Sequence, residues 1–170
     1  MSKPVPETVE SFNEARSNLL TSDYRKFKMT PGEQGDQQVW AAIMEVGFPQ
    51  TVVTLACLAD GSVQLYFGHG ASLRDGGKHP AVLARAQEFL KAAQDVLKKL
   101  SPTQNLPLPE IDRIRFYIRT FEDTYTTQAN RHIDKEDHEL FPLFRSGHEV
   151  IAALRQVQES ADTPQDQDPA

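Results

Sequence analysis

The pattern of apolar and polar residues in the middle of the chain predicts a hairpin followed by a helix. Two apolar runs, 52–58 and 63–67, flank the dipeptide Asp60-Gly61. Asp-Gly between β-rich runs is a strong hairpin signal, because glycine adopts positive φ without steric cost and aspartate tolerates it. Over residues 80–100, apolar side chains recur every three or four positions, as on one face of a helix. The pattern therefore predicts two antiparallel strands and then an amphipathic helix that packs on their sheet.

Helical spacing is also present before the hairpin. Thr30-Pro31-Gly32-Glu33 combines a capping residue, a proline suited to the first helical position and a capping-box carboxylate. Apolar residues from Val39 to Val46 then form one face, and Gly47 offers a stop. These signals predict a helix over 31–46. Apolar residues over 9–20 have a rougher helical spacing, which indicates a short leading helix.

The C-terminal third predicts two more strands and a last helix. Apolar residues alternate with polar ones over 112–120, Glu122-Asp123 suits a turn, and 125–131 is rich in threonine, as expected of a partner strand. The run 140–144 is interpreted as a fifth strand, which Pro142 would restrict to a sheet edge, or as an irregular apolar plug. Ser146-Gly147-His148-Glu149 forms a second capping box that opens the final helix.

The predicted order is helix, two strands, helix, two to three strands, helix. Short hairpin connections make neighbouring strands antiparallel. The expected fold class is α+β, with a single, mostly antiparallel sheet of four to five strands flanked by helices. Residues 1–10 and 160–170 are expected to be disordered tails, the second of them acidic, around one domain over 11–159.

This order resembles the roadblock / dynein light chain family, within the broader profilin-like group. The resemblance covers roughly residues 30 to 158 and depends on the element order, the hairpin at Asp60-Gly61 and the long helix from Pro80. It implies a dimer that acts as a scaffold or as a regulator of small GTPases. The connector 101–110 and the histidine-rich segment before the last helix depart from the family's compact pattern, so a longin-like or an unrelated α+β domain stays open.

Composition narrows the classes of function. The 170 residues carry a net charge of −6, which disfavours nonspecific attraction to nucleic acid or to anionic membranes. No apolar run has the length of a secretory signal or a membrane span, so a cytoplasmic location is expected. The single cysteine, Cys57, lies in a predicted buried strand and is interpreted as a small core residue.

A basic and aromatic face on the strand 112–120 is the first candidate site. Its members alternate along the strand: Arg113, Arg115, Tyr117 and Arg119. Arginine and tyrosine are enriched at protein interfaces, so the face is a candidate interface with a partner chain or a second copy. A solvated face and arginines paired with nearby acids are the alternatives. RNA binding is disfavoured, because the RRM signature is absent and the net charge is negative.

A glycine-rich loop over 68–79 is the second candidate, because it leads from a strand into a helix N-terminus, where free N–H groups favour anions. It departs from the P-loop motif, since Ser72 stands where the first glycine belongs and His79 where a Ser or Thr would bind Mg²⁺. The candidate anion-binding residues are His69, Ser72, Arg74, Lys78 and His79. A flexible strand-to-helix connector is the favoured interpretation of this loop, and anion binding is the alternative.

The segment 132–139 contains two imidazoles and four carboxylates. If it bound a metal, the ligands would include His132, Asp134 and His138, whose side chains Zn²⁺ accepts. The spacing matches no recognised metal motif, so a solvated loop is favoured and no cofactor is expected. His148 would be a further ligand, although the second capping box already explains a polar residue there.

No nucleophile motif accompanies these features. The preferred hypothesis is a non-enzymatic protein-interaction or scaffold module that forms a homodimer. The alternative is a small-ligand or anion-sensing domain that uses the loop 68–79. A metal-dependent enzyme with His132 and His138 is the least favoured class.

Overall fold

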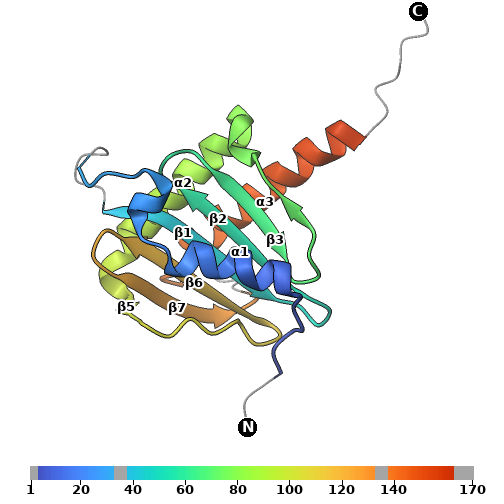
Figure 1. The fold of residues 1–170 in the computed structure, drawn as a ribbon, viewed down its shortest axis with the longest axis horizontal. Helices are drawn as coiled ribbons and strands as arrows, with labels where there is room; N and C mark the ends of the chain where they lie inside the picture. Colours follow the sequence, from blue (N-terminus) through green and yellow to red (C-terminus); the bar gives the residue numbers. More distant parts are fainter. Residues whose placement is uncertain (1–3, 33–37, 133–137, 163–170) are drawn as a thin grey trace, which may run out of the picture.

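The chain folds as an α+β domain in a computed structural model that describes residues 4–32, 38–132 and 138–162 (Figure 1). One antiparallel sheet is flanked by three helices, which confirms the predicted fold class. The sheet has seven strands, so the expectation of four to five strands was wrong. Two of the seven contain only two residues each. Strands this short have no periodicity that a sequence pattern can reveal.

The elements have the following bounds. The α-helices are α1 (Glu10–Thr21), α2 (Pro80–Val96) and α3 (Phe141–Asp162). The strands are β1 (Val39–Gly47), β2 (Val52–Leu58), β3 (Val63–Phe67), β4 (Ser72–Leu73), β5 (Ser101–Pro102), β6 (Arg113–Thr120) and β7 (Thr124–Asn130). Single 3₁₀ turns lie at η1 (Tyr24–Phe27), η2 (Gly76–Lys78) and η3 (Leu97–Lys99).

The strands follow the order β4-β3-β2-β1-β6-β7-β5, and every neighbouring pair is antiparallel. The predicted hairpin is confirmed: β2 pairs with β3, and Leu55 lies opposite Leu65. At its turn, the Asp60 carboxylate accepts a hydrogen bond from the Ser62 N–H at 2.8 Å, and Gly61 has a φ of 97°. The strands predicted on either side of the Glu122 turn are confirmed as β6 and β7. Strand β6 also pairs with β1, so β1 lies at the centre of the sheet.

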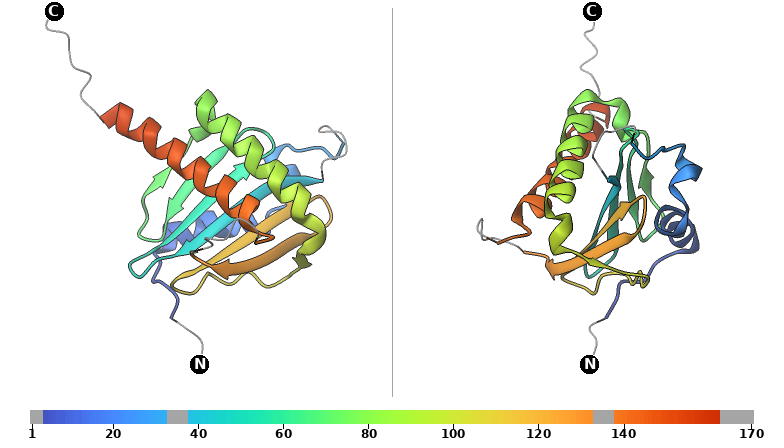
Figure 2. Two further views of the ribbon diagram at one scale, coloured as in Figure 1. Left: turned by 180° about the vertical axis from the view of Figure 1, so that it is seen from behind. Right: turned by 90° about the vertical axis from the view of Figure 1, so that its left-hand side faces the viewer.

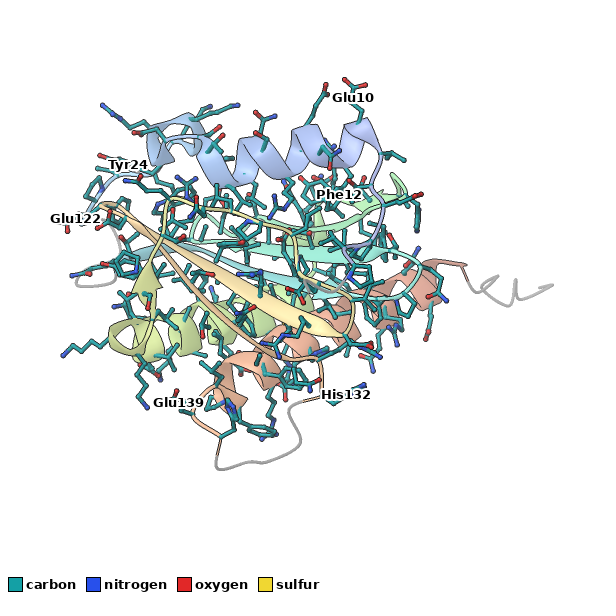
Figure 3. The ribbon with its side chains drawn as sticks, turned by 90° about the horizontal axis from the view of Figure 1, so that it is seen from below. Glu10, Phe12, Tyr24, Glu122, His132 and Glu139 are labelled. Carbon is teal, nitrogen blue, oxygen red and sulfur yellow. The ribbon has the colours of Figure 1, made fainter. Side chains whose placement is uncertain are left out.

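The helices cover the two faces of the sheet unequally. Helices α2 and α3 lie side by side on one face, and α1 lies on the other, so that the molecule has three layers (Figure 2). The larger core lies under α2 and α3 and includes Met44, Phe89 and Leu143. On the opposite face, Phe12 of α1 turns toward the sheet while Glu10 points away from it (Figure 3).

The predicted helix over 31–46 is wrong, because residues 39–47 form the central strand β1. All nine residues of β1 are buried, since the sheet is covered on both faces there. A strand buried on both faces is a continuous apolar run without the two-residue alternation that identifies a half-buried strand. A continuous apolar run contains apolar residues at helical intervals whatever its conformation, so the helical spacing did not indicate a helix. The expected capping-box carboxylate, Glu33, lies outside the described residues. The helical prediction for 9–20 is confirmed as α1.

The last helix begins earlier than predicted. Residues 141–144, interpreted as an edge strand or a plug, form the first turn of α3, where Pro142 is tolerated because the first helical N–H groups have no intrahelical partner. Ser146 is not a cap. It lies inside the helix, and its hydroxyl donates to the Leu143 carbonyl at 3.1 Å. The helix predicted from Pro80 is confirmed as α2.

The segment before α1 lies against the sheet. The Pro4 carbonyl accepts a hydrogen bond from the Ile111 N–H at 2.9 Å, the Val9 N–H donates to the Gly68 carbonyl at 2.8 Å, and Pro6 is buried. Residues 1–3 of the predicted N-terminal tail and 163–170 of the predicted C-terminal tail lie outside the described residues. Within the described part of the chain, no helix combines the length and the apolar character that crossing a membrane requires.

Candidate functional site

A small apolar cavity, named here the α3 pocket, lies between the sheet and α3. It has a volume of about 200 Å³. Four strands contribute to its wall, together with one face of α3. The lining consists of Val46, Phe48, Val53, Leu65, Phe67, Leu73, His148, Ile151, Arg155 and Gln158.

The spacing of the lining residues along the sequence places them on one face of a strand and on one side of a helix. On the strands, the lining residues of β3, Leu65 and Phe67, are two positions apart and so share a face of the sheet. On α3, the four lining residues follow one another at intervals of three, four and three, which places them on one side of the helix. The pocket is therefore the place where one face of a hairpin meets one face of a distant helix.

His148 is one of three polar residues in the lining of the pocket. Its ring lies 4.3 Å from the ring of Phe144, measured between centroids. Its Nε2 is buried and has no hydrogen-bond partner. Burial removes water from the imidazole and lowers its pKa, so the neutral form is favoured. A neutral imidazole can donate or accept one further hydrogen bond at Nε2.

The other two polar lining residues lie at exposed positions of α3. Arg155 and Gln158 are both exposed. Arg155 forms no hydrogen bond or ion pair with any residue in the described ranges. By contrast, Arg145 on the same helix donates to Glu149 at 3.1 Å. The α3 pocket thus combines apolar walls, a half-buried imidazole with a buried Nε2, and a guanidinium that pairs with no residue in the described ranges.

The residues predicted to bind an anion do not converge on this pocket. His69, Ser72, Arg74, Lys78 and His79 are all exposed, and only their neighbour Leu73 lines the α3 pocket. Lys78 lies 3.9 Å from Asp75, and both line a separate hollow together with Asp60. Two carboxylates beside one ammonium group do not favour an anion there.

Packing explains the glycines of this loop. A Cβ atom on Gly77 would lie 1.7 Å from the Gly61 carbonyl oxygen, and one on Gly76 would lie 2.6 Å from Leu154 Cδ2. Both distances are far below van der Waals contact. Gly76 and Gly77 are therefore explained by the close packing of the turn η2 against the β2–β3 hairpin and α3, which is a structural reason that does not involve phosphate.

The predicted basic and aromatic face divides into two parts. Tyr117 is fully buried, and its hydroxyl donates to the Pro107 carbonyl at 2.5 Å. Arg119 donates to the carbonyls of Leu19 and Ser22, at the end of α1, and lies 4.6 Å from the centre of the Trp40 ring. The polar groups of these two side chains therefore form hydrogen bonds within the chain.

Arg113 and Arg115 form the other part of this face. Neither guanidinium makes a hydrogen bond or ion pair with a residue in the described ranges. The Nε of Arg115 is buried without a partner. Both side chains are half-buried. Of the four predicted interface residues, these two are therefore the ones that a partner would reach.

The histidine-rich segment is described only at its ends (Figure 3). His138 accepts a hydrogen bond at Nδ1 from the Leu140 N–H at 3.1 Å, and His132 is exposed. Asp134 lies outside the described residues, so the predicted ligand set is not tested. Among residues 4–32, 38–132 and 138–162, no three His, Cys, Asp or Glu side chains gather in an arrangement suited to a metal ion.

Sequence reasoning missed two features of the α3 pocket. His148 was assigned to a capping box, and Arg155 was not singled out. The spacing of three, four and three between His148, Ile151, Arg155 and Gln158 indicates that they share one side of the last helix. That spacing does not indicate which strands this side of the helix faces. Cys57, predicted to be a core residue, is fully buried, and burial raises the pKa of its thiol.

The chain matches no protein-family model, no curated protein and no solved structure. The resemblance to the roadblock family stays a prediction.

Proposed function

We propose that this chain is a non-enzymatic binding module that takes up a small apolar ligand in the α3 pocket. The observation that carries the proposal is the make-up of the pocket wall. In the described structure, seven apolar and three polar residues surround about 200 Å³. Ligand sites in proteins typically combine an apolar wall with a few polar groups that orient the ligand.

The polar lining favours binding over catalysis. It contains one imidazole, one guanidinium and one amide, and no carboxylate, thiol or hydroxyl group lines the described pocket. Acid–base and nucleophilic catalysis use pairs of such groups within hydrogen-bond reach. The buried His148 Nε2 also supports a ligand, because an unsatisfied buried nitrogen costs about 1–3 kcal/mol. A hydroxyl, amide or carboxyl group of a ligand would remove that cost.

The test uses 1-octanol, a neutral apolar probe, with chemical-shift mapping of isotope-labelled protein. We expect saturable shifts centred on Val53, Leu65 and Ile151, which line the pocket. Leu73→Trp fills the pocket from the short edge strand β4 and should abolish these shifts, while Leu97→Trp, also half-buried but outside the pocket, should leave them. Shifts spread over the whole surface, or equal binding by the Leu73→Trp variant, would contradict the proposal.

A protein partner is the second candidate function, and Arg113 and Arg115 support it. Both arginines lie on β6, which pairs with β7. The outer edge of β7 is only partly covered, because the two-residue strand β5 pairs with Tyr125 and Thr126 alone. On this outer side, the Thr124 carbonyl accepts a hydrogen bond from the Thr103 N–H. Every second residue of a strand directs its main-chain N–H and C=O to the same edge, so those of the exposed Gln128 and Asn130 also point outward. An extended acidic segment would add there as a further strand, with β7 between it and the two arginines of β6.

The second candidate is tested with a peptide of alternating glutamate and threonine, followed by fluorescence anisotropy. Binding should be lost in the Arg113→Glu/Arg115→Glu double variant and kept in Arg74→Glu/Arg85→Glu. The homodimeric form of the hypothesis predicts a mass of two chains by light scattering at tens of micromolar. In the described ranges, Val5 and Val9 are the large apolar side chains that are exposed, which favours a reversible partner over a permanent dimer.

A further inference from the structure

We infer that the ligand of the α3 pocket is a small apolar monoanion, such as a medium-chain carboxylate, whose charged end lies at Arg155. The inference rests on the proposed function and adds the chemical class of the ligand.

The charge of the pocket lining is the first argument. Arg155 is the one permanently charged residue among the ten that line the described pocket, and none of the ten is acidic. The whole chain has 24 acidic and 18 basic residues, so carboxylates are abundant elsewhere. Glu159, one helical turn further along α3, is not among the lining residues. Arg155 makes no ion pair with a residue in the described ranges, and a cation in the lining of an apolar pocket favours an anionic ligand.

The order of groups along α3 is the second argument. His148 is half-buried with a buried Nε2, Ile151 follows one turn later, and Arg155 is exposed. Seven residues of helix span about 10 Å. The pocket thus has an enclosed end, an apolar middle and a cation at its exposed end. A carboxylate placed at Arg155 keeps part of its hydration, which avoids the large cost of burying a charge.

The size of the cavity is the third argument. Its volume is about 200 Å³. An apolar cavity of about 150 Å³ in another protein holds benzene. The α3 pocket therefore accepts an apolar body of roughly six to eight carbon atoms, and longer chains would extend past Arg155 or Gln158 into solvent.

The experiment compares three probes of one length by isothermal titration calorimetry: octanoate, octanamide and octylammonium. A charge-assisted hydrogen bond is stronger than a neutral one, so we expect octanoate to bind about tenfold more tightly than octanamide. Octylammonium should bind most weakly. All titrations use one buffer at one ionic strength, because salt weakens the contribution of an exposed charge.

Two variants locate the charge effect. Arg155→Gln should remove the preference for octanoate over octanamide. Arg145→Gln removes the same charge from the same helix outside the pocket, and the preference should persist. Both side chains are exposed, so unfolding midpoints measured by circular dichroism should confirm that both variants fold.

The outcomes separate this inference from the proposed function. Equal affinity for octanoate and octanamide, or an equal loss in the Arg145→Gln variant, overturns the inference and leaves ligand binding in place. Absence of binding by every probe overturns both. A preference for octylammonium contradicts the assigned charge directly.

Discussion

Arg16 of α1 holds the buried carboxylate of Glu45 in β1 through two hydrogen bonds. The Nε and Nη2 atoms of Arg16 lie 2.7 and 2.8 Å from the two carboxylate oxygens. The Thr54 hydroxyl donates to the same carboxylate at 2.7 Å, and Arg16 Nη2 also donates to the Leu106 carbonyl at 2.8 Å. The pair therefore connects α1, two central strands and the connector before β6. It is a satisfied structural network on the face opposite the α3 pocket.

Removing Arg16 should destabilise the fold strongly. Glu45 is completely buried, and loss of one partner leaves an uncompensated buried charge, which typically costs about 3–5 kcal/mol. We expect Arg16→Met to lower the free energy of unfolding by about that amount, measured by urea denaturation. The control is Arg25→Met, because Arg25 pairs with Asp23 at 2.9 Å on the surface. An Arg16→Met protein as stable as the Arg25→Met protein would show that Glu45 is not held as described.

The two parts of the arginine face should respond differently to alanine. Arg119 caps the carbonyls of Leu19 and Ser22, so we expect Arg119→Ala to lower the free energy of unfolding by about 2 kcal/mol. Arg113 makes no such contact, and Arg113→Ala should change stability by less than about 0.5 kcal/mol. Protease digestion near α1 provides a second measurement, since only the Arg119 variant should become more susceptible there. Similar losses in both variants would contradict this division.

Gly77→Ala should be costly for steric reasons. The added Cβ would lie 1.7 Å from a main-chain oxygen of Gly61, which cannot move without displacing the hairpin. Overpacking of this kind costs about 1–3 kcal/mol. In Gly147→Ala the nearest atom is Met44 Sδ at 2.6 Å, on a flexible side chain, and alanine favours the helix. We expect the Gly147 variant to unfold at a higher urea concentration than the Gly77 variant, and the reverse order would refute the packing explanation.

His148 should make stability depend on pH. Its pKa is lowered in the folded protein by burial, so the unfolded chain binds the proton more readily. The free energy of unfolding should therefore fall as the pH drops below the ordinary histidine value of about 6.5. His148→Gln removes this part of the dependence, and the difference in stability between about pH 7.5 and pH 5.5 should shrink relative to the original protein. His69→Gln, at an exposed position, is the control. An unchanged difference in the His148 variant would indicate that the imidazole is solvated.

The hairpin and the strands β6 and β7 could be predicted because each has a local cause. Asp60-Gly61 forms its turn through its own backbone and side chain, and β6 alternates because one face meets the core while arginines occupy the other. The helix α2 was predictable from its apolar stripe for the same reason. Local sequence and local structure agree in these elements.

The error over β1 shows where this reasoning fails. Val39–Gly47 is helical in spacing and is nevertheless a strand, because β2 and β6 pair with it on both sides and helices cover both its faces. Whether a short apolar run becomes a strand depends on neighbours that lie far away in the sequence. Glu45 was overlooked within that run for the same reason, since its partner Arg16 is 29 residues away.

Turn chemistry and the spacing of apolar side chains predict the fold class, the hairpin, the long helix from Pro80 and the burial of Cys57, because each of these has a local cause. Which chemical groups come together depends instead on how distant elements pack. His148 and Arg155 face β2 and β3 because α3 packs across the sheet, and the arginines of β6 separate into bonded and unpaired members because α1 ends above Arg119. Periodicity specifies which side of an element is apolar, but the surface that it covers is set by the packing of the whole chain.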